Sequence, residues 1–223
     1  MEVEMTEDKI KKAYKESRNI YDDVLTQNNW LSKLYINLFW GVDDNKLAEK
    51  VLEFIPNDFS GKLLDIPVGT AVFTYQKYDL LKNAEIVCID YSEEMITKAK
   101  ERFAKISNNK ITCQQGDVGN LDFDDESYDI LLSMNGFHAF PDKMKAFEET
   151  ARVIKKGGYF IGCFYIKKEK KLTDLIVNMV LSKKGWFTPP FQTKKELEDI
   201  LGRLYTSVEL SSEKSMVWFK CTK

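Results

Sequence analysis

The chain has 223 residues, with 33 lysines and arginines against 35 aspartates and glutamates, and this near balance argues against a nucleic-acid partner, which usually requires a basic excess. A single histidine and four widely separated cysteines argue against a metal site and favour a reducing compartment. No apolar run reaches membrane-spanning length and the start of the chain is too charged for a signal peptide, so we expect a cytoplasmic protein with no membrane partner.

The first predicted element is a helical segment over residues 6–40 that is rich in large aromatic side chains. These are Tyr14, Tyr21, Trp30, Tyr35, Phe39 and Trp40. We interpret residues 1–41 as a helical lid in which Tyr21 and Trp30 contact a bound ligand; the alternative is that these aromatics are ordinary helix core. A second helix is expected over residues 43–56, opened by acidic residues and stopped before Pro56.

From residue 62 onward, predicted strands and helices alternate. The strand candidates are apolar runs with little alternation, which is typical of strands covered on both faces. They are residues 62–67, 85–90, 111–116, 128–134 and 158–166, and they include Cys88, Cys113 and Cys163. Cys221 lies in a further strand candidate near the end of the chain, and we interpret all four cysteines as buried small apolar residues. The helix candidates are residues 70–82, 92–106 and 141–155, the second capped by Ser92 and the third closed by "KKGG". This alternation predicts a parallel sheet with right-handed crossovers.

The end of the chain breaks that rhythm. A helix is expected over residues 194–205, followed by "TSVELSS" and "SMVWFKCTK" with only two residues between them. So short a connection predicts an antiparallel hairpin, because it leaves no room for a crossover helix. Residues 170–192, with an apolar stripe and "GWFTPPF", are predicted to be an insertion that covers the substrate, and the nearby basic runs are interpreted as solvated surface.

Ligands of doubly wound sheets bind at the carboxyl ends of the strands. Asp90 ends the second predicted strand, 25 residues after Asp65, which is where a ribose-binding carboxylate is expected. The alternative is that Asp90 only caps the following helix. Just after the third strand, Asp117 is placed to accept from an exocyclic amine and Val118 to lie against a base, which together with Asp90 favours an adenosine ligand.

The loop after the first strand, in "LLDIPVGTAVF", is short of glycine. A dinucleotide fingerprint requires three glycines where this chain has Pro67, Gly69 and Val72, so the loop is poorly suited to a pyrophosphate. It suits a ligand without one, contacted mainly by Gly69, Thr70 and the backbone.

Four stretches together resemble the successive motifs of class I S-adenosylmethionine-dependent methyltransferases of the small-molecule type. They are "LLDIPVGTAVF", "IVCIDYSEEMITKAKERF", "CQQGDVGNLDFDDESYDILLSMNGFHAFPD" and "ARVIKKGGYF", and the resemblance covers roughly residues 45–166. It implies an α/β fold with a doubly wound, seven-stranded Rossmann-like sheet over residues 42–223, with the terminal hairpin as the reversed last strand. S-adenosylmethionine is then the implied cofactor.

The resemblance implies a role for residues at each end of that cofactor. At the adenosine end, Asp90 would bind the ribose, Tyr91 and Met95 would pack against the adenine, and Asp117 and Val118 would reach its edge.

At the methionine end, Asp65 and Gly69 would line the site, and Asn135 would lie beside the sulfonium and the substrate. The sequence departs from the family pattern at Pro67, which lacks a backbone donor, and at Ala71, which we expect to be a mild change at a helix start.

The expected activity is methyl transfer to a small-molecule acceptor by a monomer or a homodimer. His138 is a candidate general base, and the alternative is that it packs the loop after the fourth strand. Two other functions stay open: a non-catalytic module that binds S-adenosylmethionine or its demethylated product, and a nicotinamide-dependent oxidoreductase, against which the loop and the hairpin both argue.

Overall fold

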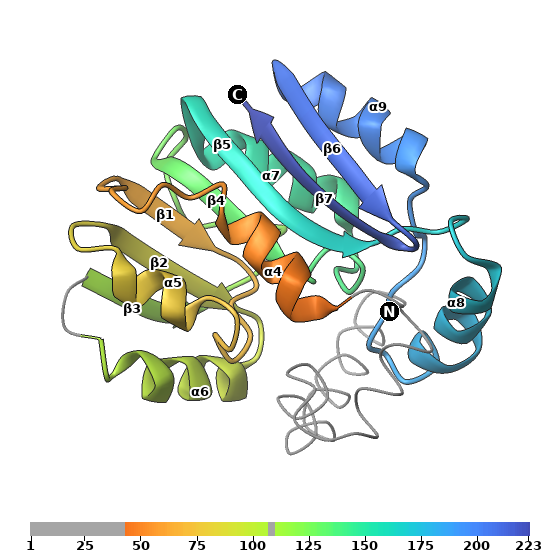
Figure 1. The fold of residues 1–223 in the computed structure, drawn as a ribbon, viewed down its shortest axis with the longest axis horizontal. Coiled ribbons are helices and arrows are strands. Elements are labelled where there is room, and N and C mark those ends of the chain that lie inside the picture. Colours follow the sequence, from red (N-terminus) through yellow and green to blue (C-terminus); the bar gives the residue numbers. More distant parts are fainter. Residues whose placement is uncertain (1–42, 107–109) are drawn as a thin grey trace.

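The computed structural model describes residues 43–106 and 110–223. The predicted N-terminal lid, with Tyr21 and Trp30, lies outside the described residues. The described strands form one seven-stranded sheet in the order β3-β2-β1-β4-β5-β7-β6 (Figure 1). The strands are β1 (Lys62–Asp65), β2 (Glu85–Asp90), β3 (Lys110–Gln115), β4 (Tyr128–Met134), β5 (Ile154–Tyr165), β6 (Ser207–Glu213) and β7 (Met216–Thr222).

Strands β1 to β5 are parallel, and β7 runs antiparallel to both β5 and β6. The predicted doubly wound sheet with a C-terminal antiparallel hairpin is therefore confirmed. The hairpin does not simply extend the sheet: β7, the later strand, lies between β5 and β6. Because the parallel strands all end at one edge of the sheet, the loops that follow them share that edge.

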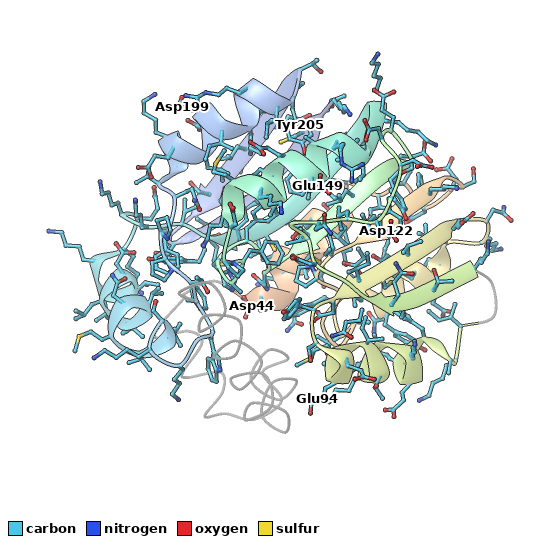
Figure 2. The ribbon with its side chains drawn as sticks, turned by 180° about the vertical axis from the view of Figure 1, so that it is seen from behind. Asp44, Glu94, Asp122, Glu149, Asp199 and Tyr205 are labelled. Atoms are coloured by element: carbon cyan, nitrogen blue, oxygen red, sulfur yellow. The ribbon has the colours of Figure 1, made fainter. Side chains whose placement is uncertain are left out.

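Helices cover both faces of the sheet (Figure 1). On one face lie α4 (Asp44–Leu52), α5 (Tyr75–Leu80) and α6 (Glu93–Phe103), whose apolar side chains share a core with Leu63, Ile86 and Leu132. On the other lie α7 (Lys143–Val153) and α9 (Lys194–Leu204), seen from the front in Figure 2, which pack on Leu64 and Phe160. Helix α8 (Lys171–Ile176) and the π-helical turn η1 (Val177–Leu181) follow β5. Alternate residues of each central strand thus supply the two cores.

Short polar side chains set the start of most helices. Asp43, Ser92 and Asp142 accept hydrogen bonds from backbone N–H groups of α4, α6 and α7, and Thr193 forms a capping box with Glu196 at α9. Each side chain satisfies a donor that the helix leaves unpaired. The predicted cap at Ser92 is confirmed.

Two predicted helix boundaries are wrong, each because of a local backbone feature. Helix α5 begins at Tyr75 rather than residue 70, because Gly69 and Ala71 have φ of +56° and +59°, which a right-handed helix excludes. The "KKGG" stretch lies inside β5 rather than at the end of α7. There Gly157 has φ of +77°, and a Cβ on Gly158 would lie 2.8 Å from the Asp129 carbonyl oxygen.

Strand β3 departs from the expectation that every strand is covered on both faces. Its side chains are exposed or half-buried, Cys113 included, because it forms the edge of the sheet and no helix is assigned between β3 and β4 among the described residues. The other three cysteines are buried as predicted.

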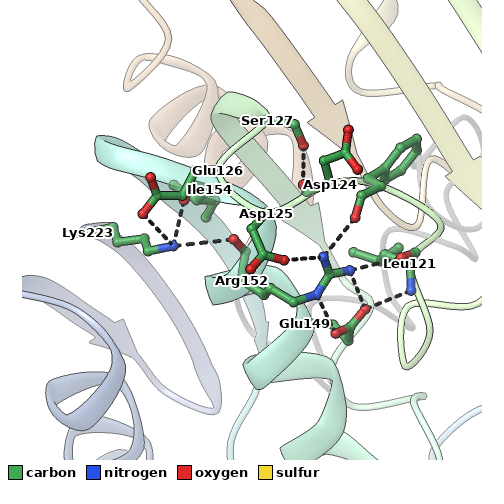
Figure 3. A network of polar contacts seen from close by, with 10 residues as sticks. Leu121, Asp124, Asp125, Glu126, Ser127, Glu149, Arg152, Ile154 and Lys223 are labelled. Carbon is green, nitrogen blue, oxygen red and sulfur yellow. Dashed lines mark hydrogen bonds and ion pairs between the residues drawn. The ribbon is translucent and has the colours of Figure 1, made fainter.

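Arg152, near the end of α7, holds the helix-free connection from β3 to β4 in place (Figure 3). Its guanidinium donates to the carbonyl oxygens of Leu121 and Phe123 and to the carboxylates of Asp125 and Glu149, at 2.7 to 2.9 Å. Glu149 in turn accepts from the Leu121 N–H at 2.8 Å. These bonds raise the pKa of Arg152 further above its usual range and lower that of Glu149. The Arg152 side chain therefore holds the connection between β3 and β4 against α7, in the absence of a crossover helix.

We predict that Arg152→Met lowers the free energy of unfolding by about 2–4 kcal/mol, because charge-assisted bonds are lost and two carbonyl groups lose their donor. Urea denaturation measures the change. The control is Arg203→Met, which removes an exposed arginine of α9 and should cost less than about 1 kcal/mol. Equal costs for the two variants would contradict the fastening role.

Candidate functional site

The loop after β1 is pinned to both neighbouring strands. The Ile66 N–H donates to the Leu132 carbonyl of β4, and the Val68 N–H donates to the Ile89 carbonyl of β2, both at 2.9 Å. Between them the Ile66–Pro67 peptide bond is cis. Pro67, which has no N–H to donate, lies between two residues whose N–H groups are both hydrogen-bonded. These two bonds fix the loop at the ends of the strands.

Asp90, the last residue of β2, joins this loop to the next one. Its Oδ2 accepts from the Gly69 N–H and its Oδ1 from the Ser92 N–H, each at 2.9 Å. Ser92 itself caps α6, so Asp90 is not the helix cap of the alternative reading. Burial raises the pKa of Asp90 to about 6, and the backbone donors oppose the rise. Asp90 is thus a buried carboxylate at the junction of two loops.

Asp65, the last residue of β1, is a second buried carboxyl at the same edge. The Tyr78 hydroxyl of α5 donates to its Oδ2 at 2.9 Å. Burial raises the pKa of Asp65 to about 8, while Tyr78 and the nearby Thr74 hydroxyl favour the charged form. Asp65 consequently carries a proton near neutral pH unless a cation lies beside it.

Gly69 and Ala71 share a left-handed backbone conformation but differ in their surroundings. A Cβ on Gly69 would meet no atom within 4 Å, so this glycine exposes bare backbone to an open space. Ala71 is buried with φ of +59°, which costs an alanine roughly 1 kcal/mol or more. The expectation that Ala71 is a mild change at a helix start is therefore wrong, because α5 begins only at Tyr75.

The loop after β4 closes the other side of this space. Asn135 has φ of +56°, which asparagine tolerates better than most residues, and its N–H donates to the Cys163 carbonyl at 2.7 Å. A Cβ on Gly136 would lie 2.3 Å from Pro67 Cδ and 2.7 Å from Phe140 Cζ. A glycine is needed at position 136 because its backbone packs directly against the Pro67 ring of the other loop.

These loops enclose a pocket that brings together six of the predicted site residues. They are Asp65, Pro67, Gly69, Thr70, Asp90 and Asn135. Five further lining residues were not predicted: Val68, Val72, Phe73, Thr74 and Met134. All but Met134 lie within five residues of Gly69 in the sequence. They were missed because a helix was expected from residue 70, whereas the loop continues to residue 74.

The four residues predicted at the adenine end do not line this pocket. Met95 and Val118 are buried. Asp117 is exposed, and its Oδ1 accepts from the Gly119 N–H of its own loop at 2.8 Å. Tyr91 is half-buried, and its carbonyl oxygen accepts from Gln115 Nε2. They lie beyond Asp90 along the strand ends rather than in the enclosed part of the site.

His138 also lies outside the pocket lining. Its ring stacks on Phe187 with centroids 3.9 Å apart and planes at 9°, and the Tyr165 N–H points at its Nδ1 at 3.5 Å. Burial, and then the charge of Lys143, lower the pKa of His138 to about 3. The imidazole is therefore neutral at ordinary pH, and it holds the segment after η1 against the β4 loop.

Sequence reasoning missed one further carboxyl at this edge. Asp44, at the start of α4, is buried, and burial followed by the charge of Asp43 raises its pKa to about 7. It is labelled in Figure 2, and its charge acts on Cys163 of β5. The pair of aspartates at 43–44 indicated only a helix start, so burial of one of them had no sequence signal.

Comparisons with known proteins agree with this geometry. Residues 63–158 match a family model described as a methyltransferase domain. A demethylmenaquinone methyltransferase of Staphylococcus epidermidis is 34% identical over 101 residues, which is 45% of this chain and 41% of that protein. The chain thus spans less than half the length of this curated relative.

Solved structures share the fold. A methyltransferase of Thermotoga maritima, described as S-adenosylmethionine-dependent and as a possible histamine N-methyltransferase, superposes with a TM-score of 0.63 at 20% identity, covering 91% of this chain and 98% of that one. Phosphoethanolamine N-methyltransferase 2 of Haemonchus contortus, solved with S-adenosylmethionine, gives 0.66 at 16% identity, covering 80% and 52%.

The part of the chain that the structure describes offers neither a metal site nor a membrane-crossing helix. Residues 43–106 and 110–223 contain no cluster of three side chains suited to a metal ion. Within the same ranges, no helix has the length and apolar character needed to cross a bilayer.

We predict that Gly136→Ala lowers the free energy of unfolding by roughly 1–3 kcal/mol, because the added methyl group overlaps the Pro67 ring. The control is Gly202→Ala in α9, where a Cβ meets no atom within 4 Å and should stabilise the protein by roughly 0.5–1 kcal/mol. Thermal and urea unfolding measure both variants. Two changes of the same sign would contradict the close packing of the loops.

Proposed function

We propose that the chain is a class I S-adenosylmethionine-dependent methyltransferase, which transfers a methyl group from S-adenosylmethionine to a small-molecule acceptor. The observation that carries this proposal is the junction at Asp90, where a buried carboxylate ends β2 directly beside the bare backbone of Gly69. A carboxylate in that position supports binding of ribose hydroxyl groups.

The residues of the pocket suit the ribose and the methionine portion of this cofactor. Asp90 accepts hydrogen bonds from the ribose in addition to those from Gly69 and Ser92, since each carboxylate oxygen has a second lone pair. The open space over Gly69 admits the methionine portion. Asp65, buried below it, supplies the negative charge for an ammonium group.

The cofactor supplies an activated methyl group, so the chain has to bind, orient and keep water out. Asn135 and Met134 lie where β4 ends and position the acceptor beside that group. With a pKa of about 3, His138 is too weak a base to accept a proton efficiently at neutral pH. We therefore assign His138 a positioning role through its stack on Phe187 rather than general base catalysis.

The acceptor class rests on the comparison with relatives. The Staphylococcus epidermidis protein is named a demethylmenaquinone methyltransferase, which supports a small-molecule acceptor. The proposal is tested by incubating the chain with methyl-labelled S-adenosylmethionine and a panel of small acceptors that includes demethylmenaquinone. Labelled product is the expected result. Tight cofactor binding without transfer to any acceptor would favour the non-catalytic module.

We predict that Asp90→Asn weakens the binding of S-adenosylmethionine at least roughly tenfold, because hydrogen bonds from the ribose to a charged acceptor become bonds to a neutral amide. Isothermal titration calorimetry measures the affinity. The matched control is Asp142→Asn, since Asp142 accepts only from the backbone of its own helix. If both variants bind as the unmodified chain does, Asp90 only joins the two loops.

We predict that binding of S-adenosylhomocysteine near pH 7 releases up to about one proton. Free Asp65 is largely protonated there because its pKa is about 8, and a cation placed beside it lowers that pKa. Calorimetry in buffers of different ionisation enthalpy measures the release. The release should disappear in Asp65→Asn and at a pH well above the pKa of free Asp65. An observed enthalpy that does not depend on the buffer would show that Asp65 keeps its protonation state.

A further inference from the structure

Helix α8 and the turn η1 expose an apolar stripe to solvent. Leu172, Leu175 and Met179 are 48%, 52% and 57% exposed, and Val180 is 39% exposed. Their spacing of three and four residues places the first three on one side of the helix. The opposite side, with Val177 and Leu181, is buried in the core. These residues are four of the six large apolar side chains that are exposed among the described residues, so the exposure is concentrated on this segment.

Lysines surround that stripe. Residues 167–184 contain six lysines and two acidic residues, in a chain whose net charge is −2. Four of the lysines, Lys168, Lys171, Lys183 and Lys184, are exposed. None of the four takes part in an ion pair among the residues that the structure describes, and Lys184 lies over the ring of Trp186 at 5.0 Å. We call these four lysines and the apolar stripe together the α8 face.

The α8 face lies beside the functional site. Figure 1 shows α8 beyond the carboxyl end of β5, clear of the helices that cover the two faces of the sheet. The segment after η1 is tied to the β4 loop by the Thr188 N–H, which donates to the His138 carbonyl at 2.9 Å. Lys143, which is buried, donates to the carbonyls of Phe140 and Thr188. The α8 face is therefore held at the edge of the sheet at which the pocket opens.

We propose that the α8 face docks on the surface of a membrane that contains anionic lipids. A short amphipathic helix with an apolar side and flanking lysines binds in the plane of a bilayer, where its apolar side chains enter the interface and its lysines meet lipid phosphates. The segment from Lys171 to Leu181 is only eleven residues long, which suits a helix lying on the surface and is too short to cross.

Charge and extent favour a lipid surface over a second copy of the chain. A symmetric contact through the α8 face would bring its lysines against the same lysines of the partner, which is unfavourable. Four apolar side chains on eleven residues also form a small contact compared with a stable protein interface. From the sequence, these lysines were expected to be solvated surface and no membrane partner was expected; the exposed apolar stripe between the lysines is visible only in the folded chain.

The test uses the full chain and sedimentation with two kinds of vesicle, one of phosphatidylcholine alone and one with an equal part of phosphatidylglycerol. The chain should sediment with the anionic vesicles and much less with the neutral ones, and raising the salt concentration should weaken binding. Leu175→Gln/Met179→Gln and Lys171→Gln/Lys183→Gln should each weaken it roughly tenfold or more.

Matched controls separate docking from general effects of polarity and charge. Leu80→Gln/Met144→Gln changes two side chains of similar exposure elsewhere on the surface, and Lys82→Gln/Lys156→Gln removes two exposed lysines near the starts of β2 and β5. Both controls should bind as the unmodified chain does. The unfolding midpoints of all four variants are measured in parallel, and the exposed positions are expected to leave them unchanged.

Three results would overturn the proposal. The first is that the unmodified chain does not bind anionic vesicles. The second is that the α8-face variants and the controls lose vesicle binding equally. The third is that the chain does not bind vesicles but forms a dimer, which Leu175→Gln/Met179→Gln dissociates. The last result would assign the α8 face to a second copy. Because vesicle binding is measured without cofactor or acceptor, its outcome is independent of the proposed methyl transfer.

Discussion

The two hydrogen bonds to Asp90 hold the site together. One oxygen accepts from Gly69 in the loop after β1 and the other from Ser92 at the start of α6. With the bond from Val68 to Ile89, they fix a loop that has almost no regular structure of its own. The left-handed residues and the open space over Gly69 depend on that fixation, because both depend on where the loop lies relative to the strand ends.

Three carboxyl groups are buried, away from water, at the edge of the sheet where the parallel strands end. Burial raises the pKa of Asp44, Asp65 and Asp90 to about 7, 8 and 6. Such desolvated carboxyls destabilise the folded chain when charged, and they are therefore expected where a ligand compensates for the loss. At the opposite edge of the sheet, Glu149 and Asp125 instead pair directly with the Arg152 guanidinium.

The sequence is informative where one residue decides the outcome and uninformative where distant residues meet. Apolar runs located the parallel strands, and two aspartates at strand ends located the pocket, since a strand end is a local property. The end of the loop at residue 74 and the left-handed backbone at Gly157 depend on backbone angles that the identities of the residues do not reveal. The fastening by Arg152 and the stack of His138 on Phe187 join residues up to 49 positions apart, which no short motif encodes. Burial of Asp44 was unpredictable for the same reason.

The position of β7 between β5 and β6 has a consequence for synthesis of the chain. The ribosome produces β6 before β7, so β6 leaves it with no completed neighbour in the sheet, and β5 presents its unpaired backbone along one side. Only when Met216–Thr222 emerges can it enter between them and pair with both. Until then β5 and β6 each have unpaired backbone groups along the side that β7 will occupy. Unpaired strand edges of this kind are sites at which incompletely folded chains aggregate. The fold is thus closed by the insertion of its latest described strand into the middle of the sheet's C-terminal half.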